Sequence, residues 1–354
     1  MRRYAKETYS VKLSAVIAKG KRPDLGGRDM SHQSSTALLF SLTLFAFGLA
    51  FVPAYVASPQ ATVVQQSGFT EDRPPSSLFV VNSPSVASRG SDSLLIFDFR
   101  GNSRTFFSSK NNFIGLRNIA CDPKKPHHIF VTHNSFPKTG GFLVFDASGQ
   151  MDTVPSGTPG GNVSLAFDDT GNLYAAQTVA GTATVFKNDV SFATLPVTGI
   201  GQLAVDSVGH LYLTDPFISP RIFRIDPTGN VTVFADASKG LESPYGLAID
   251  SANNVYVANN PGSRPAFILK LDPFGTATSF ATGISFQPII RSMVFDSNDN
   301  LYATLQNDNK ILKINRHGNS SEFATGRNGL NYPGAVAIGT CRVEEEEKEF
   351  KRRN

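Results

Sequence analysis

Short apolar runs, separated by turn residues, repeat along the chain from residue 78 onward. In the clearest copies an apolar run is followed by Asp, a small turn and a second apolar run: LAFDDTGNLYAAQT (165–178), LAVDSVGHLYLTDP (203–216), LAIDSANNVYVANN (247–260) and MVFDSNDNLYATLQ (293–306). Runs this short, bounded by Asp, Asn and Gly, are typical of β-strands joined by tight turns. The second run is apolar on both faces, which predicts strands packed between two layers.

The repeat has a regular period. The Asp residues of the four copies lie 38, 44 and 46 residues apart, at Asp168, Asp206, Asp250 and Asp296. A looser copy at 119–134 places Asp122 another 46 residues upstream. Such a period is typical of propeller blades of four strands. We interpret Asp250 and its copies as turn residues whose side chains bond the backbone two residues on.

These spacings predict an all-β domain over residues 78–340, a six-bladed β-propeller of four-stranded blades. The N-terminal piece supplies only three strands, and PGAVAIG (333–339) supplies a lone inner strand. Pairing of this C-terminal strand with residues 78–83 would close the ring without a free edge. The inner strands are expected to begin near Ile119, Leu165, Leu203, Leu247, Met293 and Val336.

The repeats resemble those of the NHL-repeat propellers and of the related senescence-marker-protein/gluconolactonase/regucalcin-like group, which share the inner strand, the Asp, the small turn and the N-L/V-Y-V-A run. The resemblance covers residues 78–340. It implies the propeller fold. Relatives with this architecture include lactone and ester hydrolases, lyases and non-catalytic binding modules, so function has to be argued from the site.

The first part of the chain differs in composition. Residues 1–35 form a basic leader with eight Lys or Arg and three Asp or Glu. The 21 residues 37–57 carry no charge, and we expect one N-terminal hydrophobic helix over 36–57. It is either a signal-anchor transmembrane helix or a signal peptide cut near Ala54 or Ser58. Translation from Met30 instead of Met1 would give a conventional secretory leader.

Charge and flanking segments complete this picture. The leader carries +5 and the whole chain +4, which leaves −1 for the rest and removes the support for a nucleic-acid partner. The basic flank before the apolar segment favours an exported domain, with an extracytoplasmic location that is secreted, periplasmic or membrane-anchored through 37–57. Residues 58–77 read as a linker and residues 341–354 as a charged tail.

A metal centre is not predicted. In the metal-dependent hydrolases of the resembled group, Asn or Asp in a P-N-G or P-D-G segment before an inner strand holds a divalent cation, but here the match is Pro244-Tyr245-Gly246. The corresponding positions in the other blades offer no carboxylate or amide, being Arg117, Val163, Gly201, Arg291 and Gly334. A hard cation needs several converging oxygens. We therefore predict no metal, no cofactor and no catalytic residue of the family type.

A polar funnel is predicted at this same end of the axis. It suits an anionic or hydroxyl-rich ligand. Its expected lining residues are Arg117, Asn118, Asp215, Tyr245, Asn259, Asn260 and Arg291. The competing interpretation is that the arginines pair with nearby acids or face solvent at a rim.

These observations predict an exported, monomeric propeller that is a non-catalytic binding module. Its expected partner is a protein or an anionic or polyhydroxylated small molecule. The alternative is a gluconolactonase-like hydrolase or lyase that uses the funnel. Cys121 is expected to be a small core residue, and a disulfide with Cys341 stays open.

Overall fold

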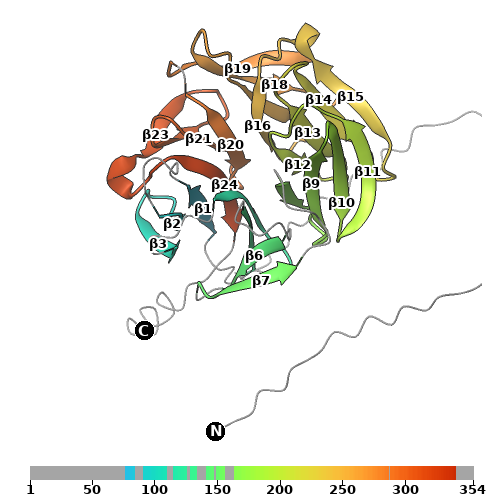
Figure 1. The fold of residues 1–354 in the computed structure, drawn as a ribbon. Coiled ribbons are helices and arrows are strands. Elements are labelled where there is room, and N and C mark those ends of the chain that lie inside the picture. The colour runs from blue at the N-terminus through green and yellow to red at the C-terminus, as the bar shows by residue number, and fades with distance from the viewer. Residues whose placement is uncertain are drawn as a thin grey trace, which may run out of the picture. The chain divides into compact units, whose positions relative to one another are not determined.

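The computed structural model describes residues 76–83, 91–109, 115–125, 128–133, 141–146, 149–155, 163–286 and 288–339. These residues form six four-stranded antiparallel sheets around one axis (Figure 1). The predicted all-β, six-bladed fold is confirmed. The predicted helix at 36–57, the basic leader, the charged tail and Cys341 lie outside the described residues. Within the part of the chain that the structure describes, no helix has the length and apolar character needed to cross a membrane.

Each sheet runs from an inner strand at the axis to an outer strand at the rim. The first three sheets are β24 (Pro333–Gly339), β1 (Ser77–Asn82), β2 (Ser93–Phe97) and β3 (Ser103–Ser108); β4 (Leu116–Cys121), β5 (Ile129–His133), β6 (Gly141–Phe145) and β7 (Met151–Pro155); β8 (Val163–Phe167), β9 (Leu173–Val179), β10 (Thr182–Lys187) and β11 (Val190–Pro196).

The other three sheets follow in chain order. They are β12 (Leu203–Val205), β13 (Leu211–Asp215), β14 (Arg221–Ile225) and β15 (Val231–Asp236); β16 (Pro244–Ile249), β17 (Val255–Asn259), β18 (Ala266–Leu271) and β19 (Ala277–Ile284); β20 (Ile290–Phe295), β21 (Leu301–Leu305), β22 (Lys310–Ile314) and β23 (Ser320–Ala324). Two short 3-10 helices, η2 (Ala237–Lys239) and η3 (Gly326–Asn328), precede β16 and β24. Each inner strand starts at, or up to three residues before, its predicted start.

One sheet combines the two ends of the described chain. β24 pairs antiparallel with β1, with Leu78 opposite Ile338 and Val80 opposite Val336. Apolar side chains fill the spaces between neighbouring sheets; one such cluster joins Tyr256 and Ile268 of one sheet to Met293 and Leu305 of the next. Each fully buried large apolar side chain stabilises the fold by about 1.5 to 3 kcal/mol.

The repeated Asp residues lie in turns between the first and second strands of the sheets. Asp250 Oδ1 accepts hydrogen bonds from the backbone N–H of Ala252 at 3.0 Å and of Asn254 at 2.8 Å, which confirms the predicted turn role. Its Oδ2 accepts the Tyr256 hydroxyl at 3.0 Å. The same three kinds of bond recur at Asp168, Asp206 and Asp296.

Four inner strands, β4, β16, β20 and β24, carry a β-bulge near the end where they begin, and in the first three the bulge contains a large side chain. In these three the register shifts lie between Leu116 and Ile119, between Pro244 and Leu247, and between Ile290 and Met293. A bulge takes a side chain out of the regular alternation and re-aims it, and here the bulges contain Arg117, Tyr245 and Arg291. Hydroxyl oxygens of Thr132 and Thr304 on the neighbouring strands accept the N–H that follows each arginine, at 3.0 and 3.1 Å. The sheet therefore fixes the backbone from which both arginine side chains start.

Side chains bridge different sheets around the axis. Ser164 Oγ accepts the Leu203 N–H at 2.9 Å. Gln202, directly before β12, accepts the N–H of Leu247 at 2.9 Å and of Met293 at 3.2 Å through Oε1. These N–H groups face the axis, where no further strand can pair with them, so the side chains satisfy donors that would otherwise lack a protein partner.

Candidate functional site

An axial cavity of about 110 Å³ opens where the inner strands begin, and we call it the mouth. All six sheets or their adjoining loops contribute to its wall. It is lined by Ser83, Leu116, Arg117, Asn118, Ser164, Ile200, Gly201, Phe217, Tyr245, Arg291, Ser292, Gln306, Tyr332, Gly334 and Ala335. The structure thus brings together four of the seven residues that the sequence predicts: Arg117, Asn118, Tyr245 and Arg291.

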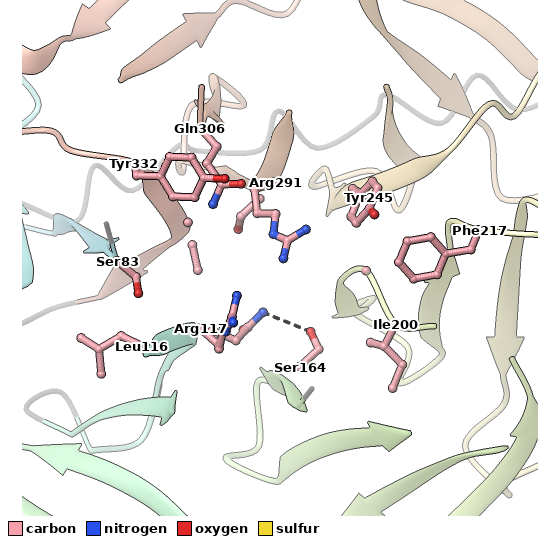
Figure 2. A pocket seen from close by; sticks show the side chains of 15 residues that line it. Ser83, Leu116, Arg117, Ser164, Ile200, Phe217, Tyr245, Arg291, Gln306 and Tyr332 are labelled. Carbon is pink, nitrogen blue, oxygen red and sulfur yellow. Dashed lines mark hydrogen bonds between the residues drawn. The ribbon is translucent and has the colours of Figure 1, made fainter. Parts of the chain in front are cut away.

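Two arginines dominate the charge of the mouth. The guanidinium groups of Arg117 and Arg291 both reach into its centre (Figure 2). Partial burial and the nearby charge of Arg291 lower the pKa of Arg117. Asp92, which is fully buried, and Tyr332 act to raise this pKa. Arginine keeps its charge at any physiological pH. Because no Asp or Glu is among the described residues that line the mouth, its wall is cationic.

Tyr245 shapes one side of the mouth together with Arg291. The guanidinium carbon of Arg291 lies 5.2 Å from the centre of the Tyr245 ring, within the range of a cation–π contact. Within the described part of the chain, Arg291 makes no ion pair with a carboxylate. Burial raises the pKa of Tyr245, and Arg291 partly offsets that effect. The phenol therefore keeps its proton at neutral pH and can donate a hydrogen bond.

Phe217, from the loop between β13 and β14, continues the wall beside Tyr245. The two rings meet edge to face, with centroids 5.9 Å apart and an interplanar angle of 87°. The Phe217 ring lies over Gly199, where an added Cβ would overlap the ring. The glycine therefore makes room for an aromatic residue at the edge of the mouth.

Asn118 lines the mouth, but its amide is used within the fold. Its Nδ2 donates to Ser164 Oγ at 3.3 Å, the dashed line in Figure 2. Its Oδ1 accepts the Leu165 N–H at 3.4 Å. Asn118, the residue after Arg117, therefore connects β4 to β8.

Asp215 does not line the mouth and lies fully buried behind its wall. Its carboxylate accepts hydrogen bonds from the Thr198 hydroxyl at 2.6 Å and from the Gly199 N–H at 3.2 Å, and it pairs with Arg221 at 3.1 Å. The same Thr198 hydroxyl accepts the Ile218 N–H at 3.3 Å. Asp215 thus holds the backbone that carries Phe217.

Asn259 and Asn260 also lie outside the lining and support the backbone next to it. Asn259 is fully buried, and its Oδ1 accepts the Glu242 N–H at 2.6 Å, in the turn that leads to Tyr245. Asn260 Oδ1 accepts the Ile290 N–H at 2.8 Å, one residue before Arg291. The three predicted residues that miss the mouth therefore position residues that line it.

Some lining residues were not predicted from the sequence, among them Ser83, Phe217, Gln306 and Tyr332. Tyr332 has a φ of 57°, a left-handed conformation that is unusual for a bulky residue, above all before a proline. Asn309 Oδ1 accepts its N–H at 2.6 Å and holds it there. The equivalent Ser243 before Pro244 has a φ of 50°. The sequence does offer one signal for Tyr332, because β16 and β24 both begin with a proline. This signal does not tell which side chain near the proline reaches the axis.

The other end of the axis is acidic. A cavity of about 320 Å³ there is lined in part by Asp169, Asp206, Asp250, Asp296 and Asp299. Three of these carboxylates accept the hydrogen bonds of their own turns. Among the residues that the structure describes, no group of three or more His, Cys, Asp or Glu is arranged to hold a metal ion. These carboxylates lie at this end of the axis because the turns between the first and second strands lie there, as the turn role predicted from the sequence requires.

Cys121 lies at the end of β4, half-buried against the apolar cluster that includes Phe79 and Ile119. An added Cβ at Gly339 of β24 would lie 2.6 Å from its sulfur. This position agrees with the expected role of Cys121 as a small core residue. A disulfide with Cys341 stays an open prediction, because Cys341 lies outside the described residues.

The chain is similar in fold to several solved structures. A nidogen/laminin complex contains a chain with 15% identity and a TM-score of 0.60, covering 75% of this chain and 98% of that chain. TolB from Acinetobacter baumannii has 15% identity and a TM-score of 0.57, covering 75% and 66%. A streptogramin B lyase has 14% identity and a TM-score of 0.50, covering 77% and 93%. No family model and no curated protein matches the chain. At these identities the likeness concerns the propeller fold.

Proposed function

We propose that the chain is a binding module and that its mouth binds an anionic group. One observation carries this proposal: two guanidinium groups meet in a single axial cavity whose described lining contains no carboxylate. Bulges fix the backbone at both arginines, so both side chains leave their strands toward the axis. Partial burial and the repulsion from Arg291 lower the pKa of Arg117, and an anion between the two guanidinium groups offsets that repulsion.

The neutral residues of the mouth fit the same function. Tyr245 keeps its proton and can donate to an oxygen, and Gln306 and Ser83 offer amide and hydroxyl groups at the opposite side (Figure 2). Planar guanidinium groups bind carboxylates through two parallel hydrogen bonds. The fold is compatible with a protein partner, since a propeller of similar fold is solved in a nidogen/laminin complex.

A thermal-shift experiment tests the binding of anions. At constant ionic strength, replacing chloride by acetate should raise the melting temperature of the protein, because a ligand that binds only the folded state stabilises it. The double variant Arg117→Ala, Arg291→Ala should lose this shift. The matched control, Arg104→Ala with Arg316→Ala, removes the same charge from exposed positions away from the mouth and should keep it. An equal shift in both double variants would overturn the proposal.

The alternative, a gluconolactonase-like hydrolase or lyase that uses the mouth, makes a different prediction. It requires a group in the mouth that exchanges a proton with the substrate at working pH. The raised pKa of Tyr245 keeps its hydroxyl protonated at neutral pH, so this residue donates hydrogen bonds and does not serve as a general base. Hydrolysis of gluconolactone by the purified protein, lost in the Arg117→Ala, Arg291→Ala variant, would favour the enzyme over the binding module.

We further propose that the propeller is exported and works outside the cytoplasm, either released or anchored through residues 37–57. This rests on the uncharged segment and its basic flank. Mass spectrometry of the mature protein from membrane and soluble fractions distinguishes the two fates. An N-terminus near Ser58 in the soluble fraction indicates cleavage, and a full-length chain in the membrane fraction indicates an anchor.

A further inference from the structure

The mouth is small for the ligand class that its charge suits. Pockets for free small molecules usually enclose roughly 300 to 1,000 Å³, whereas the mouth has about 110 Å³. This space accepts one carboxylate with a short aliphatic stem and leaves the remainder of any larger ligand outside. What lies around the opening then decides what kind of molecule carries the carboxylate. This step rests on the proposed function of the mouth.

An exposed apolar surface borders the mouth. Phe217 is 53% exposed and Ile218 is 87% exposed, and both lie in the loop between β13 and β14. We call these two residues the apolar lip. Phe217 is the one that also lines the mouth, so the lip is continuous with the cationic wall. Large apolar side chains at this exposure, next to Tyr and Arg, have the composition of protein–protein hot spots.

The apolar lip is held in place. Its backbone is fixed by the Ile218 N–H bond to Thr198 Oγ1, and Thr198 is in turn bound to the buried Asp215. The Phe217 ring packs edge to face on Tyr245 and over Gly199. A pre-ordered loop keeps two large apolar side chains in solvent at a hydrophobic cost, while little conformational entropy remains to be lost on binding.

A third exposed apolar residue lies on the same face. Phe286 is 61% exposed in the connection from β19 to β20, which leads into the strand of Arg291. This face of the ring therefore carries exposed apolar side chains in two connections, of which the apolar lip adjoins the mouth. A small polyhydroxylated ligand in the mouth would leave the apolar lip uncovered, whereas a polypeptide crossing the opening would cover it.

We propose that the mouth and the apolar lip together form a docking surface for a segment of another protein. In this segment an Asp or Glu lies within a few residues of a large aliphatic or aromatic residue. The acidic side chain enters the mouth between Arg117 and Arg291, and the apolar side chain packs on Phe217 and Ile218. Charge complementarity selects the acidic residue, and the covered apolar area supplies the rest of the affinity.

Selection from a displayed library of random heptapeptides tests this proposal, with the purified propeller as bait. The expected result is enrichment of peptides in which Asp or Glu stands near Leu, Ile, Val or Phe. On bait carrying Ile218→Ser, which changes the apolar lip but no residue that lines the mouth, the acidic enrichment should remain while the apolar enrichment weakens. On the Arg117→Ala, Arg291→Ala bait, the acidic enrichment should disappear.

Measured affinities of one selected peptide complete the test. The Phe217→Ser, Ile218→Ser variant should bind it about tenfold more weakly. The matched control is Phe274→Ser, which removes an exposed phenylalanine, 94% exposed, from a turn between β18 and β19 away from the mouth, and it should bind normally. Circular dichroism and melting curves verify that each variant is folded.

The outcomes separate the two proposals. Acidic enrichment without an apolar companion, or an apolar enrichment that is equally strong on the Ile218→Ser bait, overturns the docking surface and leaves the anion-binding mouth standing. Absence of acidic enrichment together with an acetate shift that requires the arginines points to a free small anion and also overturns the docking surface. Absence of both effects overturns the mouth as a binding site.

Discussion

At the residue scale, the turn carboxylates couple the stability of the fold to pH. Partial burial acts to raise the pKa of Asp168, but the hydrogen bonds from Asn172 and Thr170 outweigh it and lower the pKa below its ordinary value. A carboxylate whose pKa is lower in the folded than in the unfolded state stabilises the fold above the unfolded pKa. This stability is lost as the pH falls through the folded pKa.

The variant Asp168→Asn tests this coupling. It should have a lower free energy of unfolding than the wild type near neutral pH, and the difference should shrink once the pH falls below about 4. Urea denaturation at a series of pH values measures the difference. Asp169→Asn is the control, because it removes the same charge from the exposed neighbouring residue. A difference that does not change with pH would contradict the assigned hydrogen bonds.

Single residues also mark how far the site could be predicted from the sequence. Aligning the inner strands identified Arg117, Tyr245 and Arg291, because bulges at equivalent positions point these side chains to the axis. Asp215, Asn259 and Asn260 have polar side chains at the same end, but they turn inward to bind backbone N–H groups. Sequence pattern places a residue at the end of a strand and does not tell whether its side chain satisfies the backbone or faces the ligand.

At the scale of elements, the strands were predictable and the loops that complete the site were not. Short apolar runs bounded by Asp turns predict the β-strands. The lining residues Phe217, Gln306 and Tyr332 lie in connections whose paths depend on tertiary hydrogen bonds. The bond from the Tyr332 N–H to Asn309 Oδ1 joins residues 23 positions apart. Such contacts have no local pattern in the sequence.

The inner strands lead to a prediction about Gln202. Its side chain binds the backbone of two other sheets, and Nε2 also donates to the Met293 carbonyl at 3.2 Å. The variant Gln202→Ala leaves these groups without their partner and should lower the free energy of unfolding by about 1 to 3 kcal/mol. Chemical denaturation measures this value. Gln150→Ala, in an exposed turn, should change it little, and an equal effect of both variants would contradict a bridging role.

At the scale of the whole molecule, the period of the repeat predicted six blades. The 38 to 46 residues between successive Asp positions allow four strands each. The sequence supplies three strands at the start of the repeats and a lone inner strand at their end, so these four were predicted to share a sheet. In the structure β24 pairs with β1, as predicted. The ligand could not be predicted, because the same ring carries different chemistries on its loops.

We propose that the pairing of β24 with β1 closes the ring, and a truncation tests it. A chain ending at residue 332 lacks β24 and exposes the edge of β1, so it should lose cooperative unfolding and aggregate. A chain ending at residue 340 lacks only the charged tail and should unfold like the full chain. Size-exclusion chromatography and thermal melts compare the two. A monomeric, cooperatively folded chain ending at 332 would contradict closure through β24.

The central claim, that the mouth binds an anionic group between two arginines, is tested most directly by nuclear magnetic resonance. The Nε–H signals of Arg117 and Arg291, assigned through single Arg→Lys variants, are followed while acetate replaces chloride at constant ionic strength. Both signals should shift along one saturating curve, and those of the exposed Arg104 and Arg316 should not. Equal, non-saturating shifts of all four arginines, or no shift at Arg117 and Arg291, would contradict the claim.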